Sequence, residues 1–311
     1  MNPSTRELFI GIAAALGVVV MWTSFQLISR AGIQSTLTPY DLTTLRFGIG
    51  AIVLLPVALR LGRGNQTFGQ LATLALFAGP GFALFAFAGY QFAPTAHGAA
   101  ILSGTVSMFA ALFAFLILRE RQSPLQVGGL AVLLAGVLLL AGDAFGDGPS
   151  DQWIGDLLFL TGAASWAVFA VLARKWKVAP MRATAWTAVL SAAAFVPVHL
   201  LFLPTNLTGT PWLEVAGQGF YQGILSMIVS MWLFTRAVAA IGATLTSVIA
   251  SAVPAVATIC AWLMLGETVS DLTLAGVVAV TAGILGAAIG SGLARRRATL
   301  ALRAAAAEPG E

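Results

Sequence analysis

Ten long apolar segments, separated by short connections that contain proline, glycine and charged residues, make up most of the chain. A helix needs about 20 apolar residues to cross the hydrocarbon core of a bilayer. Only 9% of the 311 residues are Asp, Glu, Lys or Arg, against about 25% in a typical soluble domain, so the chain cannot cover a water-soluble surface. The sequence therefore predicts an all-α integral membrane protein with ten transmembrane helices, at residues 8–29, 41–60, 68–90, 97–118, 124–142, 153–173, 182–203, 213–235, 244–265 and 272–293.

The composition and motifs also exclude several classes of function. Cys260, the single cysteine, lies within an apolar run, so the chain cannot form an internal disulfide or a cysteine-rich metal site. The sequence has no Walker A motif, metal-ligand cluster or nucleophile–base arrangement, and we expect no cofactor, no metal and no enzymatic activity. The net charge of +4 comes from basic residues near the ends of segments, which favours a role in membrane topology over a nucleic-acid partner.

The basic residues lie mainly on one side of the predicted membrane. If the N-terminus is cytoplasmic, fourteen of the sixteen Lys and Arg residues are cytoplasmic, Arg30 is on the outer side and Arg46 is within the second helix. The positive-inside rule therefore predicts that both termini are cytoplasmic. The outer connection between the fifth and sixth helices carries no cation and four aspartates, Asp143, Asp147, Asp151 and Asp156.

The two halves of the sequence are similar to each other at offsets of 141 to 147 residues. The aligned pairs include Gly11 and Gly155, Trp22 and Trp166, Arg30 and Arg174, Pro39 and Pro180, and Glu120 and Glu267. Each half contains five predicted helices, an odd number, so the second half must be inverted relative to the first. Inverted repeats are typical of secondary transporters, which bind substrate near the midplane between the repeats. We predict a first repeat at 8–142, a second repeat at 153–293 and a cytoplasmic tail at 294–311.

Several short motifs occur in order along the two halves. The first half has Trp22, Leu45-Arg46-Phe47 and Leu118-Arg119-Glu120, and the second half has Gly155-Asp156, Trp166, Pro254 and Leu265-Gly266-Glu267. Together they resemble the EamA family of the drug/metabolite transporter superfamily over almost the whole chain. One departure is Ser107, which stands where the first repeat of the family commonly has the proline represented by Pro254 in the second.

The resemblance implies a secondary transporter of the bacterial inner membrane that exports amino acids or other small metabolites by alternating access. Its substrate would pass through a cavity between the two repeats. The aromatic amino-acid exporters are the nearest analogy, so large neutral or aromatic amino acids are the expected substrates. An exporter of drugs or other small organic metabolites and a passive channel remain alternatives.

Aromatic and polar residues at membrane depth are candidates for the substrate site, because burying polar groups in lipid is unfavourable unless they are compensated. Trp22 and Gln26 are four residues apart in the first helix and share a face. Trp166 and Phe169 lie at matching depth in the sixth helix. We expect the two tryptophans to line the cavity or, alternatively, to fill space between tilted helices, and Trp232 in the eighth helix is a further candidate wall.

Further candidates lie in the third, fourth and ninth helices. Tyr90 and His97 are close together near the outer surface, and Ser103 follows on the fourth helix. His97 could bind a substrate carboxylate or take up a proton, or it could be satisfied at a helix N-terminus. Ser251 precedes Pro254, which frees a backbone carbonyl. The Ser251 hydroxyl and this carbonyl could contact an ammonium group, or the small residues here could only permit close helix packing.

Charged groups are scarce within the predicted spans. We expect Arg46 to pair with Asp41 or to snorkel, in preference to contacting substrate. Because no Asp or Glu lies near mid-membrane, we expect transport without obligatory proton or sodium coupling. Glu120 and Glu267 close helices on opposite membrane faces, which is typical of helix-end or gating groups.

The tenth predicted helix carries small residues at four-residue spacing, namely Ala275, Ala279, Gly283 and Ala287. Such a ridge allows two helix backbones to approach closely. Packing against the fifth helix explains the ridge more simply than a dimer does, so we expect a monomer whose partners are membrane lipids and a small-molecule substrate.

Overall fold

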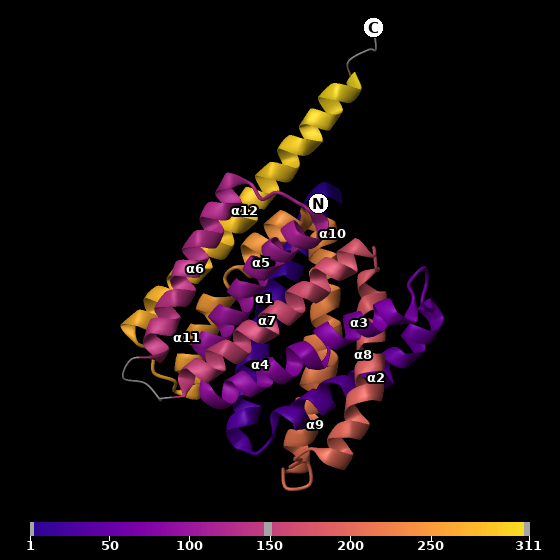
Figure 1. The fold of residues 1–311 in the computed structure, drawn as a ribbon, viewed down its shortest axis with the longest axis vertical. Helices are drawn as coiled ribbons and strands as arrows, with labels where there is room; N and C mark the ends of the chain where they lie inside the picture. The colour runs from indigo at the N-terminus through magenta and orange to yellow at the C-terminus, as the bar shows by residue number, and fades with distance from the viewer. Residues whose placement is uncertain (1–2, 146–150, 308–311) are drawn as a thin grey trace.

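The computed structural model describes residues 3–145 and 151–307, and every regular element in these ranges is a helix (Figure 1). The helices are α1 (Pro3–Ser35), α2 (Pro39–Leu61), α3 (Phe68–Ala78), α4 (Pro80–Phe92), α5 (Thr95–Leu118), α6 (Pro124–Ala144), α7 (Gln152–Lys175), α8 (Pro180–Phe202), α9 (Trp212–Phe220), the π-helix η1 (Tyr221–Val229), α10 (Ser230–Ala250), α11 (Val253–Leu265) and α12 (Asp271–Ala307). Asp147 and residues 308–311 of the predicted tail lie outside the described residues.

The predicted spans are present, with two unexpected joints. Among the described residues, nine helices are long and apolar enough to cross a membrane, and the shorter α11 supplies part of a tenth span. The eighth and ninth predicted spans are joined, because one helical stretch runs from Trp212 to Ala250. It turns at Gly242, whose φ of 81° and ψ of 158° are not helical. Glycine adopts a positive φ without the steric penalty of a Cβ, so one residue replaces the expected loop.

The ninth span is itself interrupted near its middle. The helix ends at Ala250, a turn covers Ser251 and Ala252, and α11 begins at Val253. Pro254 lies in the first turn of α11, where its missing N–H and its ring are tolerated, whereas both would disrupt a continuous helix. The tenth helix, by contrast, continues past its predicted end at residue 293 to Ala307, and this extension projects from the bundle in Figure 1.

Helices at equivalent positions in the two halves pack against each other. α2 packs on α8, α5 packs on α11 and α6 packs on α12. The contact of α4 with α7 likewise has its counterpart in the contact of α10 with α1. Two related five-helix units around a common axis produce this pattern, and their odd number of spans inverts the second unit relative to the first.

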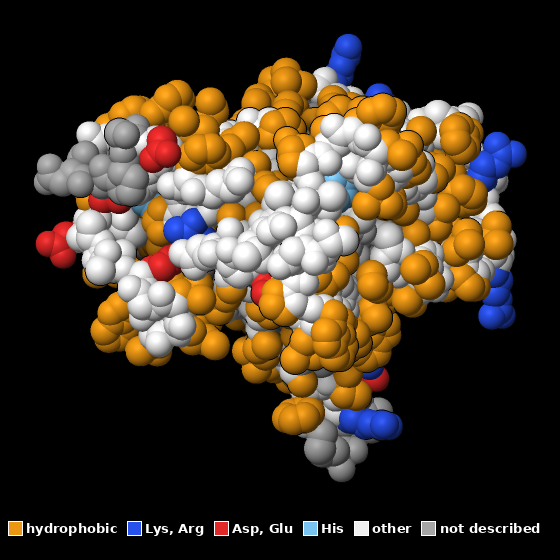
Figure 2. All heavy atoms as spheres, turned by 90° about the horizontal axis from the view of Figure 1, so that it is seen from below, with side chains coloured by type: hydrophobic (Ala, Val, Ile, Leu, Met, Phe, Trp, Pro, Cys, Tyr) orange, Lys and Arg blue, Asp and Glu red, His pale blue; other side chains and the backbone are white. Residues whose placement is uncertain are grey.

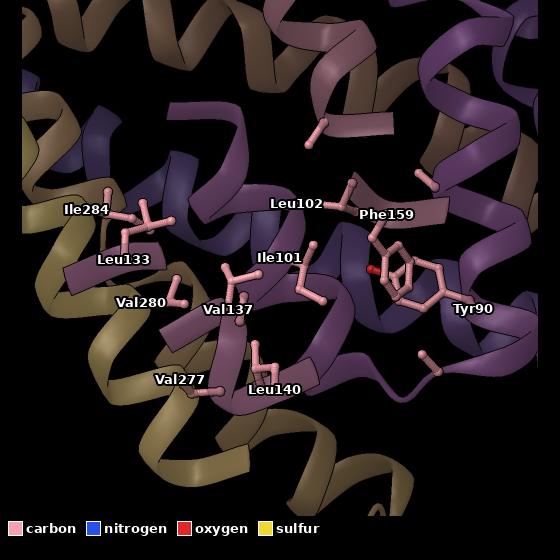
Figure 3. Packing of buried hydrophobic residues seen from close by; sticks show 14 residues of the cluster. Tyr90, Ile101, Leu102, Leu133, Val137, Leu140, Phe159, Val277, Val280 and Ile284 are labelled. Carbon is pink, nitrogen blue, oxygen red and sulfur yellow. The ribbon is translucent and has the colours of Figure 1, made fainter. Parts of the chain in front are cut away.

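The contact between α6 and α12 depends on glycine. A Cβ on Gly129 would collide with the backbone of Ala287, and a Cβ on Gly283 would collide with the backbone of Leu133. Between these close approaches, branched side chains of the two helices form part of a buried cluster: Leu133, Val137, Leu140, Val277, Val280 and Ile284 (Figure 3). The predicted packing of the tenth helix on the fifth is confirmed for Gly283 and Ala287, whereas Ala275 of the same predicted ridge is exposed.

Apolar side chains cover the outside of the bundle. Large exposed examples occur on many helices and include Phe9, Ile52, Leu116, Leu138 and Leu263. Figure 2 shows hydrophobic side chains over much of the visible surface, most acidic side chains toward one end, and several basic side chains at the opposite end. Because so large an apolar surface is unfavourable in water, the chain is a multi-pass membrane protein.

Candidate functional site

Arg46 is buried in the interior of the bundle and has no acidic partner among the described residues. Its side chain is only 6% exposed. The Nη1 atom donates to Ser226 Oγ at 2.8 Å and to Gln222 Oε1 at 3.4 Å, whereas the buried Nε atom has no hydrogen-bond partner in the part of the chain that the structure describes. The guanidinium carbon lies 5.3 Å from the centre of the Phe25 ring. Its surroundings therefore include two neutral polar groups and the aromatic rings of Phe25 and Phe47.

The predicted pairing of Arg46 with Asp41 is wrong. Asp41 belongs to the capping box that starts α2, and it also accepts hydrogen bonds from Thr205 and from the Asn206 backbone. Five residues separate Asp41 from Arg46, which corresponds to a rotation of about 140° around an α-helix of 3.6 residues per turn. The two side chains therefore leave α2 on different faces and cannot meet.

The polar partners of Arg46 come from η1, the π-helical part of the eighth span. Gln222 also donates to Ser29 Oγ of α1 at 3.1 Å, and Tyr221 donates to Ser24 Oγ at 2.7 Å. These bonds connect α1, η1 and α2 around the guanidinium. Because short π-helical insertions are rare and occur frequently at functional sites, η1 marks this region as a candidate site independently of Arg46.

A row of aromatic rings extends from Arg46 toward α7. The Phe25 ring stacks on Phe82 at 6.2 Å between centroids, Phe82 lies 4.9 Å from Trp166, and Trp166 lies 5.2 Å from Phe169. We call these four residues the aromatic row. The aromatic row includes two residues predicted from the sequence, Trp166 and Phe169. Arg46 lies beside Phe25, at the other end of the row. The sequence analysis did not identify Phe25 and Phe82 as candidates. The signal that could have led to this region is the charge of Arg46 within an apolar span.

The other predicted residues occupy different environments. Tyr90 and Gln26 are both buried, and the Tyr90 hydroxyl donates to Gln26 Oε1. Trp22 is half-buried and stacks on Phe234 of α10 at 5.8 Å. Trp232 is 57% exposed and lines a groove on the surface with residues of α1. The structure thus brings Gln26 and Tyr90 together but does not bring Trp232 into the same region.

The two predicted serines are held locally. Ser103 is half-buried on α5. Ser251 is buried at the break between α10 and α11, and its hydroxyl donates to the Val248 carbonyl at 2.7 Å. Because this hydroxyl donates its hydrogen to a carbonyl of the preceding helix, Ser251 has a local structural role in this conformation.

His97 lies in a buried network of polar groups at one end of the bundle. Its Nδ1 atom is 2.9 Å from Asp156 Oδ1, and its Nε2 atom is 3.2 Å from Asp143 Oδ2. Gln152 and Thr273 also lie within hydrogen-bond distance of Nε2. Both ring nitrogens of His97 therefore have partners, and the network joins α5, α6, α7 and α12.

Of the ion pairs that connect the halves, two are equivalent to each other and lie at opposite ends of the bundle. Arg30 Nε lies 3.1 Å from Glu267 Oε1, and Glu267 also accepts hydrogen bonds from the backbone and hydroxyl of Thr95. Arg174 Nη2 lies 2.8 Å from Glu120 Oε2. The side chains of the first pair are 17% and 9% exposed, and those of the second pair are 52% and 49% exposed. Equivalent contacts are therefore enclosed at one end and open to solvent at the other.

Comparison with known proteins gives one family and several relatives. The model of the EamA-like transporter family matches residues 9–142 and 153–289. An aromatic amino acid exporter, YddG, from Ancylobacter novellus is 28% identical over 65% of this chain and 71% of its own. A probable amino-acid metabolite efflux pump from Salmonella typhimurium is 25% identical over 87% of this chain and 92% of its own. One crystal structure with 22% identity superposes with a TM-score of 0.61 over 92% of this chain and 98% of that chain, which supports the fold.

Proposed function

This chain belongs to the EamA-like transporter family, and from that premise we propose that it is a secondary transporter that exports amino acids with large neutral or aromatic side chains. Transport would proceed by alternating access between two inverted repeats, at 8–142 and 153–293, in the bacterial inner membrane. Both termini and the tail at 294–311 would be cytoplasmic, because fourteen of the sixteen basic residues then lie on that side.

The unequal exposure of the two equivalent ion pairs carries this proposal. In the proposed orientation, the Arg30–Glu267 pair lies at the outer face and the Arg174–Glu120 pair lies at the cytoplasmic face. A transporter built from inverted repeats exchanges the conformations of its two halves when it changes from inward-facing to outward-facing. The enclosed outer pair and the solvated inner pair are what an inward-facing state would have.

The same geometry suggests how the states interconvert. To open outward, α1 must separate from the connection after α11, which breaks the Arg30–Glu267 pair and releases Thr95. The Arg174–Glu120 pair would then become enclosed at the inner face. Exposed ion pairs contribute only about 0–1 kcal/mol, so the gain of burial at one end can offset its loss at the other without a large net change.

The aromatic row and the names of two relatives support the choice of substrate. Offset and tilted ring pairs contribute about 0.5–1.5 kcal/mol beyond area burial, and a substrate ring near Trp166 could join such contacts. The relatives from Ancylobacter novellus and Salmonella typhimurium are named as an aromatic amino acid exporter and a probable amino-acid metabolite efflux pump. We further propose that the substrate gradient drives export and that the chain works as a monomer.

Counterflow in liposomes tests the function. Purified protein is reconstituted, unlabelled L-phenylalanine is trapped inside, and uptake of labelled phenylalanine is followed with all twenty amino acids as competitors. We expect trapped substrate to accelerate uptake, large neutral and aromatic amino acids to compete, and a proton ionophore to leave exchange unchanged. Uptake that ignores the trapped substrate would indicate a channel, and competition by no amino acid would exclude the proposed substrates.

A further inference from the structure

We propose that Arg46 binds the carboxylate of the transported substrate, in a subsite that it shares with Gln222 and Ser226. The inference rests on the proposed function and adds the residue that selects for the negative group of the substrate. It begins with an electrostatic imbalance. A guanidinium keeps its positive charge at any physiological pH, and a charge inside a bilayer is unfavourable unless it is paired or solvated.

The groups around Arg46 compensate this charge only in part. Ser226 and Gln222 accept from Nη1, and the Phe25 ring faces the guanidinium carbon, but none of these groups carries a negative charge. The Nε atom is buried without a hydrogen-bond partner. Arg30, at the end of the bundle, is by contrast paired with the carboxylate of Glu267, so only one of these two arginines has a negatively charged partner among the described residues.

A carboxylate fits what is missing. The guanidinium presents its N–H groups as a planar fork that matches the two oxygens of a carboxylate. A bound carboxylate could accept from Nε and bring the negative charge that the described residues around Arg46 do not supply. Because Arg46 is a single cation with no second Lys or Arg partner in its contacts, the subsite suits a monoanion in preference to a dianionic phosphate.

The position of Arg46 also suits an amphipathic substrate. The aromatic row starts beside the guanidinium at Phe25 and continues through Phe82 to Trp166. A carboxylate at Arg46 would therefore direct an apolar side chain along the rings. Because Arg46 is 6% exposed, a substrate reaches it only when the helices around it move apart, which is the kind of movement that alternating access requires.

Binding to matched probes tests the subsite without relying on transport. The probes are L-phenylalanine, 3-phenylpropionate, which keeps the carboxylate and lacks the amine, and L-phenylalaninamide, which keeps the amine and lacks the carboxylate. Affinities are measured by calorimetry on the purified full-length protein. Since a hydrogen bond to a charged group contributes about 1.5–3 kcal/mol, we expect the amide to bind wild type at least about tenfold more weakly than phenylalanine.

Variants of two arginines on the same helix give the second measurement. Arg46→Gln should weaken phenylalanine and 3-phenylpropionate by at least about tenfold and leave the amide unchanged, and Arg46→Lys should restore part of the loss. Arg60→Gln, which changes an exposed arginine of α2, should alter none of the three affinities. If Arg46→Gln does not fold, the comparison of acid and amide on the wild type decides alone.

Each result separates the subsite from the proposed function. Equal affinity of wild type for phenylalanine and its amide, no binding of 3-phenylpropionate, or equal losses for all three probes in Arg46→Gln would overturn the subsite. Phenylalanine counterflow could still occur in that case, and the proposed function would stand. Conversely, Arg46-dependent binding of 3-phenylpropionate without counterflow of any amino acid would leave the subsite and remove the proposed substrates.

Discussion

Arg30 in the first repeat pairs with Glu267 in the second, with 3.1 Å between Nε and Oε1. The inverted equivalent of this contact is the pair of Arg174 in the second repeat with Glu120 in the first. Each pair therefore joins one repeat to the other, at opposite ends of the bundle. Sequence alignment of the two halves already matched Arg30 with Arg174 and Glu120 with Glu267, but only the structure shows that each arginine selects the glutamate of the other half.

Loss of the Arg30–Glu267 pair should favour opening at that end of the protein. In a Cys260→Ala background, Ser29→Cys places a thiol at a buried position beside Arg30. Coupled charged residues interact by about 0.5–3 kcal/mol, so Glu267→Gln should accelerate labelling of this thiol by a maleimide by at least about twofold. The double variant Arg30→Glu/Glu267→Arg should return the rate toward that of the parent. An unchanged rate in Glu267→Gln would show that the pair does not hold this end closed.

The span pattern could be predicted from the sequence because a bilayer imposes both the length and the composition of each helix. The close packing of α6 on α12 could be predicted in part, because Gly283 and Ala287 of the small-residue ridge lie at the contact, whereas Ala275 of that ridge is exposed. His97 was different. Its carboxylate partners are 46 and 59 residues away in sequence, and no spacing rule connects positions that only tertiary packing brings together.

The π-helix explains why the eighth span was less predictable. In η1 the backbone hydrogen bonds join residues five apart, whereas in an α-helix they join residues four apart. This difference rotates every later side chain of the span to another face of the helix. Gly223 of η1 packs against Ile49 and the backbone of Gly50 in α2, so tertiary contact accompanies the irregular helix. The prediction for Trp232 considered only its depth in the membrane. In the structure Trp232 lies on the outside of the bundle, whereas Gln222 and Ser226 contact Arg46.

Neighbouring glycines of α6 should differ sharply in their tolerance of alanine. A Cβ on Gly129 would collide with the α12 backbone, whereas a Cβ on Gly128 would meet nothing within 4 Å. Gly129→Ala should destabilise the protein and lower its thermal midpoint in detergent. Gly128→Ala should be neutral or raise stability by up to about 1 kcal/mol, because alanine favours helix more than glycine does. Equal effects of the two changes would argue against the close α6–α12 contact.

Cysteine labelling in intact cells should determine the orientation. In a Cys260→Ala background, Asp147→Cys should react with a membrane-impermeant maleimide from outside, and Lys177→Cys should react only after permeabilisation. The reason is the asymmetry of basic residues, which retains Lys and Arg on the cytoplasmic side. The reverse pattern would place the termini outside and exchange the faces assigned to the two ion pairs.

Removing the indole of Trp166 should affect aromatic substrates most. Trp166 contacts Phe82 and Phe169 in the aromatic row, and ring pairing contributes about 0.5–1.5 kcal/mol beyond area burial, or about 2–13-fold in affinity. In competition counterflow, Trp166→Ala should therefore weaken phenylalanine and tryptophan by about this factor relative to leucine. Trp262→Ala, which removes an exposed indole from α11, serves as the control and should leave the order of competitors unchanged. Equal losses for leucine and phenylalanine in a folded Trp166→Ala protein would show that Trp166 supports packing, and the substrate ring would then have to lie elsewhere.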